Sequence, residues 1–199
     1  MQGKSNLKTF KDVPGFCNFY DLYAHMVSQA TTQSHFVEVG ALYGHSAAFM
    51  VDCMKLRQIR FQFDVIDVWD ETGVPELKTP GDRMLTEVIG PDYYENRQDK
   101  LYIKFLQYMM ETDSLDWMTP IRLPSLTACQ LYADKSLDFV FIDSCHDYEA
   151  VKADIQAWSK KIRPGGVLAG HDYDWPTVRK AVDELLKPTI ARTSWYVNV

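Results

Sequence analysis

The sequence of 199 residues predicts a doubly wound α/β fold, in which a mostly parallel sheet carries helices on both faces. Two observations predict it. Short β-rich runs alternate with amphipathic helical stretches along most of the chain. One of these runs, Leu137–Asp143 (LDFVFID), is almost continuously apolar, which is typical of a central strand covered on both faces. The length suits a single domain, 1–199, with a sizeable core.

The first elements are a helix and a βαβ unit. Apolar residues at helical spacing predict a helix over Asn18–Ala30, and residues 1–17 before it are expected to form a loose N-terminal arm. His35–Gly40 reads as a strand that ends in glycine, Gly44–Lys55 as a helix and Phe61–Val68 as a second strand. This succession implies parallel strands joined by a right-handed crossover.

Residues 70–115 are less regular and contain several glycines and prolines. A helix is expected from about Glu95 to Met110. The stretch is longer than a tight α/β connection requires, so we expect it to be partly a crossover helix and partly a lid-like insertion over the site. An irregular but packed crossover is the alternative.

The second half of the chain continues the alternation. A weak strand, a short helix, a clear strand and an amphipathic helix are expected at Trp117–Leu123, Ser125–Tyr132, Leu137–Asp143 and Tyr148–Lys160. Arg163–Gly166 (RPGG) is expected to stop this last helix before a buried strand at Val167–Gly170. A helix over Thr177–Lys187 and a final strand at Trp195–Val197 complete the pattern.

Charge and composition narrow the classes of partner. The net charge is −6 and the pI is about 5.3, without the clustered Lys and Arg that a sequence-independent grip on nucleic acid needs. A small or neutral substrate fits better than a nucleic acid. No apolar run approaches the roughly 20 residues that span a bilayer, and the start of the chain does not resemble a signal peptide.

The four cysteines show no CxxC spacing, so neither a zinc ribbon nor a redox pair is indicated. We therefore expect a cytoplasmic protein with reduced thiols and no membrane partner. The oligomeric state stays open, a homo-oligomer included.

The ends of the predicted strands carry the chemistry. In a doubly wound sheet, ligands bind beyond the carboxyl ends of the strands. Four strand ends bear an acid or a glycine: Glu38–Gly44, Asp67, Asp143 and His171-Asp172. Gly40 and Gly44 let the backbone turn tightly and approach a ligand, and the amides of the following helix point to the same place. A turn that merely packs a helix would use the same glycines.

Two acids refine the interpretation of this turn. Asp67, at the end of the second strand, can accept both hydroxyls of a ribose, which would serve NAD and S-adenosylmethionine alike. Glu38 would repel a pyrophosphate but is compatible with a positively charged sulfonium amino acid. The full GxGxxG pattern is also missing, because the loop reads Gly40-Ala41-Leu-Tyr-Gly44. An NAD-dependent oxidoreductase and a non-catalytic S-adenosylmethionine-binding protein remain the alternatives.

The series Glu38-Val-Gly40-x-x-x-Gly44, Asp67, LDFVFID and RPGG resembles the motifs of class I S-adenosylmethionine-dependent methyltransferases, over roughly residues 15–199. The segment 141–149 (FIDSCHDYE), with Asp154, Trp158 and 170–173 (GHDY) after it, is similar to the subgroup that includes the macrocin O-methyltransferases and uncharacterised bacterial and phage relatives. That subgroup usually has glycine where this chain has Ser144. The resemblance implies a Rossmann-like methyltransferase fold with a seven-stranded-type sheet.

The resemblance also implies roles for individual residues. S-adenosylmethionine would be the cofactor, and the acceptor would be a hydroxyl of a small molecule or sugar. The cofactor would be bound by residues at three strand ends and in one short helix: Glu38, Gly40, Ala41 and Gly44 towards its methionine part, Asp67 at the ribose, Ser125 and Leu126 near the adenine, and Asp143 beside the reaction centre.

A divalent metal is a further implication of the resemblance. Metal-dependent O-methyltransferases hold Mg2+ with an Asp after the fourth strand and an acidic or amide pair after the fifth, which match Asp143 and His171-Asp172 here. Carboxylate oxygens suit Mg2+, whereas the imidazole of His171 is a better ligand for a transition metal. In the alternative interpretation Asp143 helps to position the cofactor and Asp172 caps a turn.

Methyl transfer often needs a base for the proton of the acceptor. His146 and His171 are the candidates, because only histidine titrates near neutrality when unperturbed. His146 follows a strand end by three residues and can point into the cleft, so it is favoured slightly over His171, with Asp143 beside it. His25 is expected at the surface or in packing, and His45 next to the cofactor.

Overall fold

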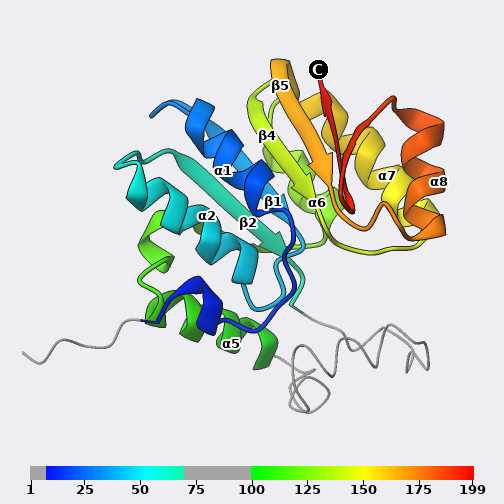
Figure 1. Cartoon of the computed structure of the whole chain (residues 1–199). Coiled ribbons are helices and arrows are strands. Elements are labelled where there is room, and N and C mark those ends of the chain that lie inside the picture. The colour runs from blue at the N-terminus through cyan, green and yellow to red at the C-terminus, as the bar shows by residue number, and fades with distance from the viewer. Residues whose placement is uncertain (1–7, 70–99) are drawn as a thin grey trace, which may run out of the picture.

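The computed structural model describes residues 8–69 and 100–199 (Figure 1). These ranges contain a seven-stranded sheet in the order β3-β2-β1-β4-β5-β7-β6. Its strands are β1 (His35–Val39), β2 (Gln62–Asp67), β3 (Thr119–Arg122), β4 (Leu137–Ile142), β5 (Ile162–Gly170), β6 (Thr189–Ala191) and β7 (Ser194–Asn198). The first five pair in parallel, and β7 runs antiparallel between β5 and β6. The predicted doubly wound, mostly parallel sheet is confirmed.

Helices cover both faces of the sheet, as Figure 1 shows. One layer contains α1 (Tyr20–Gln29), α2 (His45–Leu56) and α5 (Lys100–Glu111), and the other contains α6 (Ser125–Ala128), α7 (Tyr148–Trp158) and α8 (Pro176–Leu185). The central strand β1 supplies both hydrophobic clusters: Phe36 packs with the first layer, Val37 and Val39 with the second. Successive side chains of a strand point to opposite faces, so β1 contributes apolar side chains to both layers.

One predicted boundary is wrong. Arg163–Gly166 was expected to form the stop after a helix, but it lies inside β5, and α7 has already ended at Trp158, followed by a 3₁₀ turn. The register with β4 jumps here, so these residues form a bulge, in which Arg163, Pro164 and Gly165 are exposed and Gly166 is buried. Gly165 supplies the left-handed backbone (φ +80°) that lets the strand bulge without a break.

The edge strand β6 was missed altogether. All three of its residues are exposed, and it pairs only with β7. A short edge strand of this kind has neither an apolar face nor an alternating pattern, so its sequence carries no period that would reveal it. The last strand, predicted over Trp195–Val197, is confirmed as the core of β7.

The described part of the expected N-terminal arm, residues 8–17, is packed rather than loose. Val13 is buried, its carbonyl oxygen lies 2.7 Å from Nδ1 of His45, and the ring of Phe10 packs edge-on against Phe49. This segment therefore covers the start of α2, next to the glycine turn. Residues 1–7 of the arm lie outside the described residues.

The predicted helix between the second and third strands is present as α5, which buries Leu101, Phe105 and Met109, while Tyr108 is partly buried. The expected start of this helix at Glu95, and residues 70–99 of the expected insertion, lie outside the described residues, so a lid over the site stays a prediction. In the described ranges, none of the helices has the length and apolar character that crossing a bilayer demands.

Candidate functional site

The glycine loop after β1 is built against the end of β4. Gly40 has φ +91°, and a Cβ at this position would lie 2.0 Å from the backbone oxygen of Asp143 and 2.9 Å from Cα of Ser144. Only glycine fits such a close approach in a left-handed conformation. The backbone amide of Asp143 in turn donates to the oxygen of Val39 (2.8 Å). Two of the four predicted strand ends are therefore in direct contact.

Gly44 closes the same loop at the start of α2. It is the N-cap residue, with φ +89°, and an added Cβ would meet Met109 and Phe105 of α5 at 2.6 and 2.8 Å. Ala41 between the two glycines is buried. The loop predicted to contact the cofactor is thus held between the end of β4, which Gly40 contacts, and α5, which Gly44 contacts.

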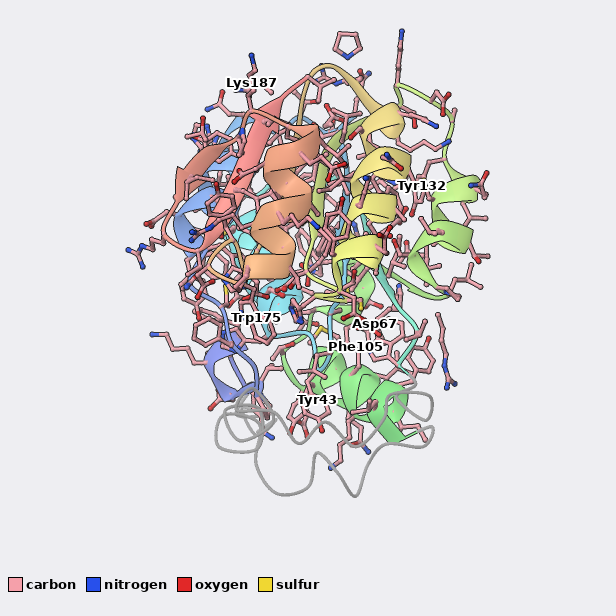
Figure 2. The ribbon with its side chains drawn as sticks, turned by 90° about the vertical axis from the view of Figure 1, so that its right-hand side faces the viewer. Tyr43, Asp67, Phe105, Tyr132, Trp175 and Lys187 are labelled. Atoms are coloured by element: carbon pink, nitrogen blue, oxygen red, sulfur yellow. The ribbon has the colours of Figure 1, made fainter. Side chains whose placement is uncertain are left out.

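Asp67, at the end of β2, organises this loop from the other side. Its Oδ2 accepts hydrogen bonds from the amides of Ala41 (2.8 Å) and Leu42 (2.9 Å), and its Oδ1 accepts one from the amide of Trp69 (2.8 Å). The indole of Trp69 donates to the carbonyl of Leu42 (2.7 Å). Figure 2 shows Asp67 at the same end of the domain as Tyr43 and Phe105. Sequence reasoning assigned Asp67 to the ribose and missed this role in holding the loop.

Glu38 lies beneath the loop, inside the sheet. Its side chain is buried, and it accepts hydrogen bonds from the hydroxyls of Tyr23 (2.9 Å) and Ser46 (2.6 Å). Burial raises the pKa of Glu38 to about 8, although both hydrogen bonds act in the opposite direction. Burial therefore favours the neutral form of this carboxyl group, which weakens the expected repulsion of a pyrophosphate by its charge.

The β3 end carries Ser125 and Leu126, the expected neighbours of the adenine. β3 pairs with β2 so that Arg122 lies opposite Asp67, which places the start of α6 at the same edge of the sheet. Leu126 is 46% exposed. The hydroxyl of Ser125 is already engaged, because it donates to Asp154 and accepts from the indole of Trp158.

Acids and imidazoles gather at the ends of β4 and β5. Nε2 of His146 lies 2.7 Å from Oδ2 of Asp172, and Nδ1 of His171 lies 3.1 Å from Oδ1 of the same carboxylate. Nδ1 of His171 is also 3.8 Å from Oδ1 of Asp143. Asp172 itself has φ +55°, an uncommon conformation that aspartate tolerates better than most residues. The structure thus brings together all four predicted residues of the reaction centre.

The two histidines differ in access. The His146 side chain is 38% exposed, and Trp175 stacks on its ring at 4.7 Å between centroids. His171 is 3% exposed, and its Nε2 lies 2.9 Å from Oδ1 of Asn18 and 2.8 Å from Oγ1 of Thr193. His146 is therefore the imidazole that a ligand can reach, whereas the buried His171 holds Asp172 in place through the contact of its Nδ1 with Oδ1. Figure 2 places Trp175 at the same end of the domain as Asp67.

The cluster shifts the pKa values of its members in opposite directions. Burial lowers the pKa of His146, but the hydrogen bond and charge of Asp172 outweigh it and raise the pKa overall. Burial alone would raise the pKa of Asp172, yet the hydrogen bonds from both histidines hold it well below its usual range. Burial raises the pKa of Asp143. Asp172 is therefore the carboxylate whose charged form the two histidines stabilise.

Within the described ranges, one group could hold a metal ion: Asp143, His146 and Asp172 offer ligand atoms that lie within 4.8 Å of one another. Two carboxylates and one imidazole form a donor set that suits a divalent ion, Mg2+ or a transition metal. The predicted set contained His171 in place of His146. A pocket lies at this group, and Val151, Val178 and Trp195 add apolar walls to it.

Sequence reasoning missed three supporting side chains: Asn18, Thr193 and Trp175. Asn18 and Thr193 come from opposite ends of the chain and meet only at His171. No local pattern could reveal them, because their role depends on how the termini pack. Trp175 stands directly before the proline that opens α8, and its position after the predicted strand end was the one available signal.

Comparison with known proteins gives a family and a fold. A family model described as a methyltransferase domain matches residues 37–173. Among solved structures, a protein from Corynebacterium glutamicum is similar with a TM-score of 0.61, at 13% identity over 94% of this chain and 82% of that one. The O-methyltransferase NovP gives 0.57, at 19% identity over 90% and 78%. CalS11, a calicheamicin methyltransferase, gives 0.58, at 15% identity over 90% and 76%.

A search of the curated proteins finds no match. At these identities the solved structures support the fold, whereas the family model identifies the family. Its match begins in β1 and ends just after Asp172, so it includes the glycine loop, Asp67 and the acid–imidazole cluster. It does not favour an oxidoreductase or a non-catalytic binding protein. The chain therefore belongs to the family of methyltransferase domains, and its function is methyl transfer from S-adenosylmethionine.

Proposed function

We propose that the chain methylates a hydroxyl group of an uncharged small molecule, a sugar or a related natural product. The observation that carries this proposal is the His146–Asp172 pair beside the pocket at the strand ends. An alcohol holds its proton tightly, so a positioned base is useful for a hydroxyl acceptor. The names of the similar structures support the substrate class, since NovP is an O-methyltransferase and CalS11 a calicheamicin methyltransferase.

The residues at the sheet edge fit the cofactor. Gly40 keeps the loop pressed against the end of β4, so the loop amides and the carboxyl groups of Asp67 and Asp143 share one edge. We assign the methionine part to the loop Gly40-Ala41 to Gly44, the ribose to Asp67, and the adenine to Ser125 and Leu126. Glu38 supports the loop from beneath. When bound, S-adenosylmethionine supplies a methyl group that its sulfonium already activates.

The chain itself then has to align the acceptor and take its proton. When the ring proton of His146 is on Nε2, this N–H donates a hydrogen bond to Asp172. Nδ1 of the same ring then carries a free lone pair and can act as a base. No described residue hydrogen-bonds this Nδ1. It accepts the proton of the acceptor hydroxyl, and Asp172 stabilises the resulting imidazolium, as a carboxylate does for the histidine of hydrolase triads. Trp175 keeps the ring in place by stacking on it.

A metal ion is the second candidate for this position, favoured by the close ligand atoms of Asp143, His146 and Asp172. A bound divalent ion would hold the acceptor oxygen and lower the pKa of its hydroxyl. Removal of the metal distinguishes the two roles of His146. If the metal role is right, extensive treatment with EDTA abolishes turnover, and Mg2+ or a transition metal restores it. Full turnover after metal removal would instead leave His146 as the base.

The test of the proposed acceptor is a transfer assay. The chain is incubated with methyl-labelled S-adenosylmethionine and a panel of neutral sugars, phenols, amines and carboxylates, and products are identified by mass spectrometry. We expect label on hydroxyl oxygens only. His146→Ala should lower turnover, whereas His25→Ala, a change at an exposed histidine on α1, should not. Labelling confined to nitrogen or carbon acceptors would overturn the proposal.

A further inference from the structure

A buried carboxylate on α7 joins two loops of the site. Asp154 is 5% exposed, and each of its oxygens receives one hydroxyl donor. Ser125 donates to Oδ1 (2.6 Å) and Ser144 to Oδ2 (2.9 Å). The Ser125 hydroxyl also accepts a hydrogen bond from the indole of the fully buried Trp158 (2.9 Å). These four side chains form one continuous hydrogen-bonded network.

The two serines belong to different loops. Ser125 begins α6, directly after the loop that follows β3, and Ser144 lies between β4 and α7, next to Asp143. The backbone of Ser144 also supports the glycine loop, because a Cβ on Gly40 would lie 2.9 Å from its Cα. Through two hydroxyls, Asp154 therefore fixes both the proposed adenine end and the proposed methionine end of the cofactor site.

Packing alone does not require a carboxylate at position 154. The neighbouring inward positions of α7 are Val151, Ile155 and Trp158, and an apolar residue could continue this buried face. Burying a carboxylate is costly unless its oxygens are hydrogen-bonded. The contacts described for Asp154 come from two hydroxyls and from no cation. What a carboxylate adds is a pair of acceptors at a fixed separation, one for each loop.

We propose that Asp154 is a positioning residue for the cofactor, which holds the Ser125 and Ser144 loops at the spacing that S-adenosylmethionine requires. This inference rests on the proposed placement of the cofactor along the same strand ends. It gives Ser144 a role that glycine could not fill, because glycine has no hydroxyl to donate to Asp154. The effect acts on binding through the loops, without contact between Asp154 and the cofactor.

The experiment measures the dissociation constant of S-adenosylhomocysteine by calorimetry, and the melting temperature, for the full chain and its variants. Ser125→Ala removes the hydrogen bonds to Asp154 and from Trp158, and Ser144→Ala removes the one to Asp154. Each variant should weaken binding about threefold to tenfold. Ser136→Ala is the matched control, because its exposed hydroxyl donates only to the nearby Ala133 carbonyl (2.8 Å). It should leave the dissociation constant unchanged.

Two variants of Asp154 separate positioning from a merely structural role. Asp154→Asn keeps one acceptor and offers an amide to the second serine, so we expect binding within about threefold of wild type. Asp154→Ala should weaken binding about as much as the double variant Ser125→Ala/Ser144→Ala, and adding it to that double variant should weaken binding no further.

Equal affinity of all serine variants and wild type would overturn the proposal. The proposal would also fail if the losses of affinity were proportional to the losses in melting temperature across all variants, Ser136→Ala included. A loss of affinity in Asp154→Asn as large as in Asp154→Ala would contradict it as well. Binding to wild type is the reference throughout. Its absence would instead contradict the cofactor assignment itself, so the two failures are distinguishable.

Discussion

Replacing Gly40 by alanine tests the core of the proposed cofactor site. The new Cβ would lie 2.0 Å from the backbone oxygen of Asp143, and backbone atoms cannot move aside as a flexible side chain can. The left-handed conformation (φ +91°) adds a second cost of about 1–2 kcal/mol for a residue with a Cβ. Overpacking of this kind costs a further ~1–3 kcal/mol, so we expect a total loss of about 2–5 kcal/mol.

Gly165→Ala is a matched control for the conformational part. Gly165 has a similar φ of +80°, but the nearest atom to an added Cβ is 3.7 Å away, at the end of the Arg163 side chain. This variant should lose only the ~1–2 kcal/mol of left-handed strain. At about 2–4 °C per kcal/mol for a domain of this size, Gly40→Ala should melt roughly 2–12 °C below the control.

Binding provides the second measurement on this pair. Separation of the glycine loop from the end of β4 should weaken S-adenosylhomocysteine binding in Gly40→Ala by more than tenfold, because loop and strand end no longer share one edge. Gly165→Ala should bind like wild type, since its bulge lies at the other end of β5. If the two variants melt and bind alike, the close approach at Gly40 is not what shapes the site, and the reasoning fails.

Four further predictions concern single side chains. Asp67→Ala frees three backbone amides of the loop region, so calorimetry should show S-adenosylhomocysteine binding weakened at least tenfold; an unchanged affinity would contradict its role. His146→Ala should lower kcat in steady-state assays by about 10²–10⁴-fold while the affinity for S-adenosylhomocysteine stays within about twofold. Trp175→Ala should lower kcat less, by roughly tenfold, and a loss confined to cofactor affinity would argue against stacking on His146. Burial raises the pKa of Glu38 from 4.5 to about 8, so the folded state holds this proton more tightly than the unfolded state. Relative to Glu38→Gln, wild type should therefore lose stability as the pH rises from 4.5 to 8, as measured by urea unfolding; a parallel pH dependence would refute the burial argument.

The sequence was informative wherever a residue acts within its own segment. The strand ends at Gly40, Asp67, Asp143 and Asp172 could be predicted because each follows an apolar run, and parallel strands bring such ends to one edge. The family match and the sheet order confirm the methyltransferase fold that these motifs indicated. The individual ligand contacts of these residues stay predictions.

The remainder depends on contacts between distant segments. The preference for His146 over His171 came from its distance after a strand, whereas the difference in access arises from Asn18 and Thr193, which bury His171 from the two ends of the chain. Likewise, the charge of Glu38 was used against a pyrophosphate, but the fold buries this carboxyl group beside Tyr23, and burial favours its neutral form. Burial of a polar group is a tertiary property that a single strand pattern does not contain.

The central claim is that S-adenosylmethionine lies along the edge formed by the glycine loop, Asp67 and Asp143. The most direct measurement is a crystal structure of the chain with S-adenosylhomocysteine. We predict the amino-acid part at Gly40–Gly44, the ribose at Asp67, and the sulfur directed towards Asp143 and His146. A complex in which the ligand occupies another part of the domain, and leaves this edge free, would contradict the account.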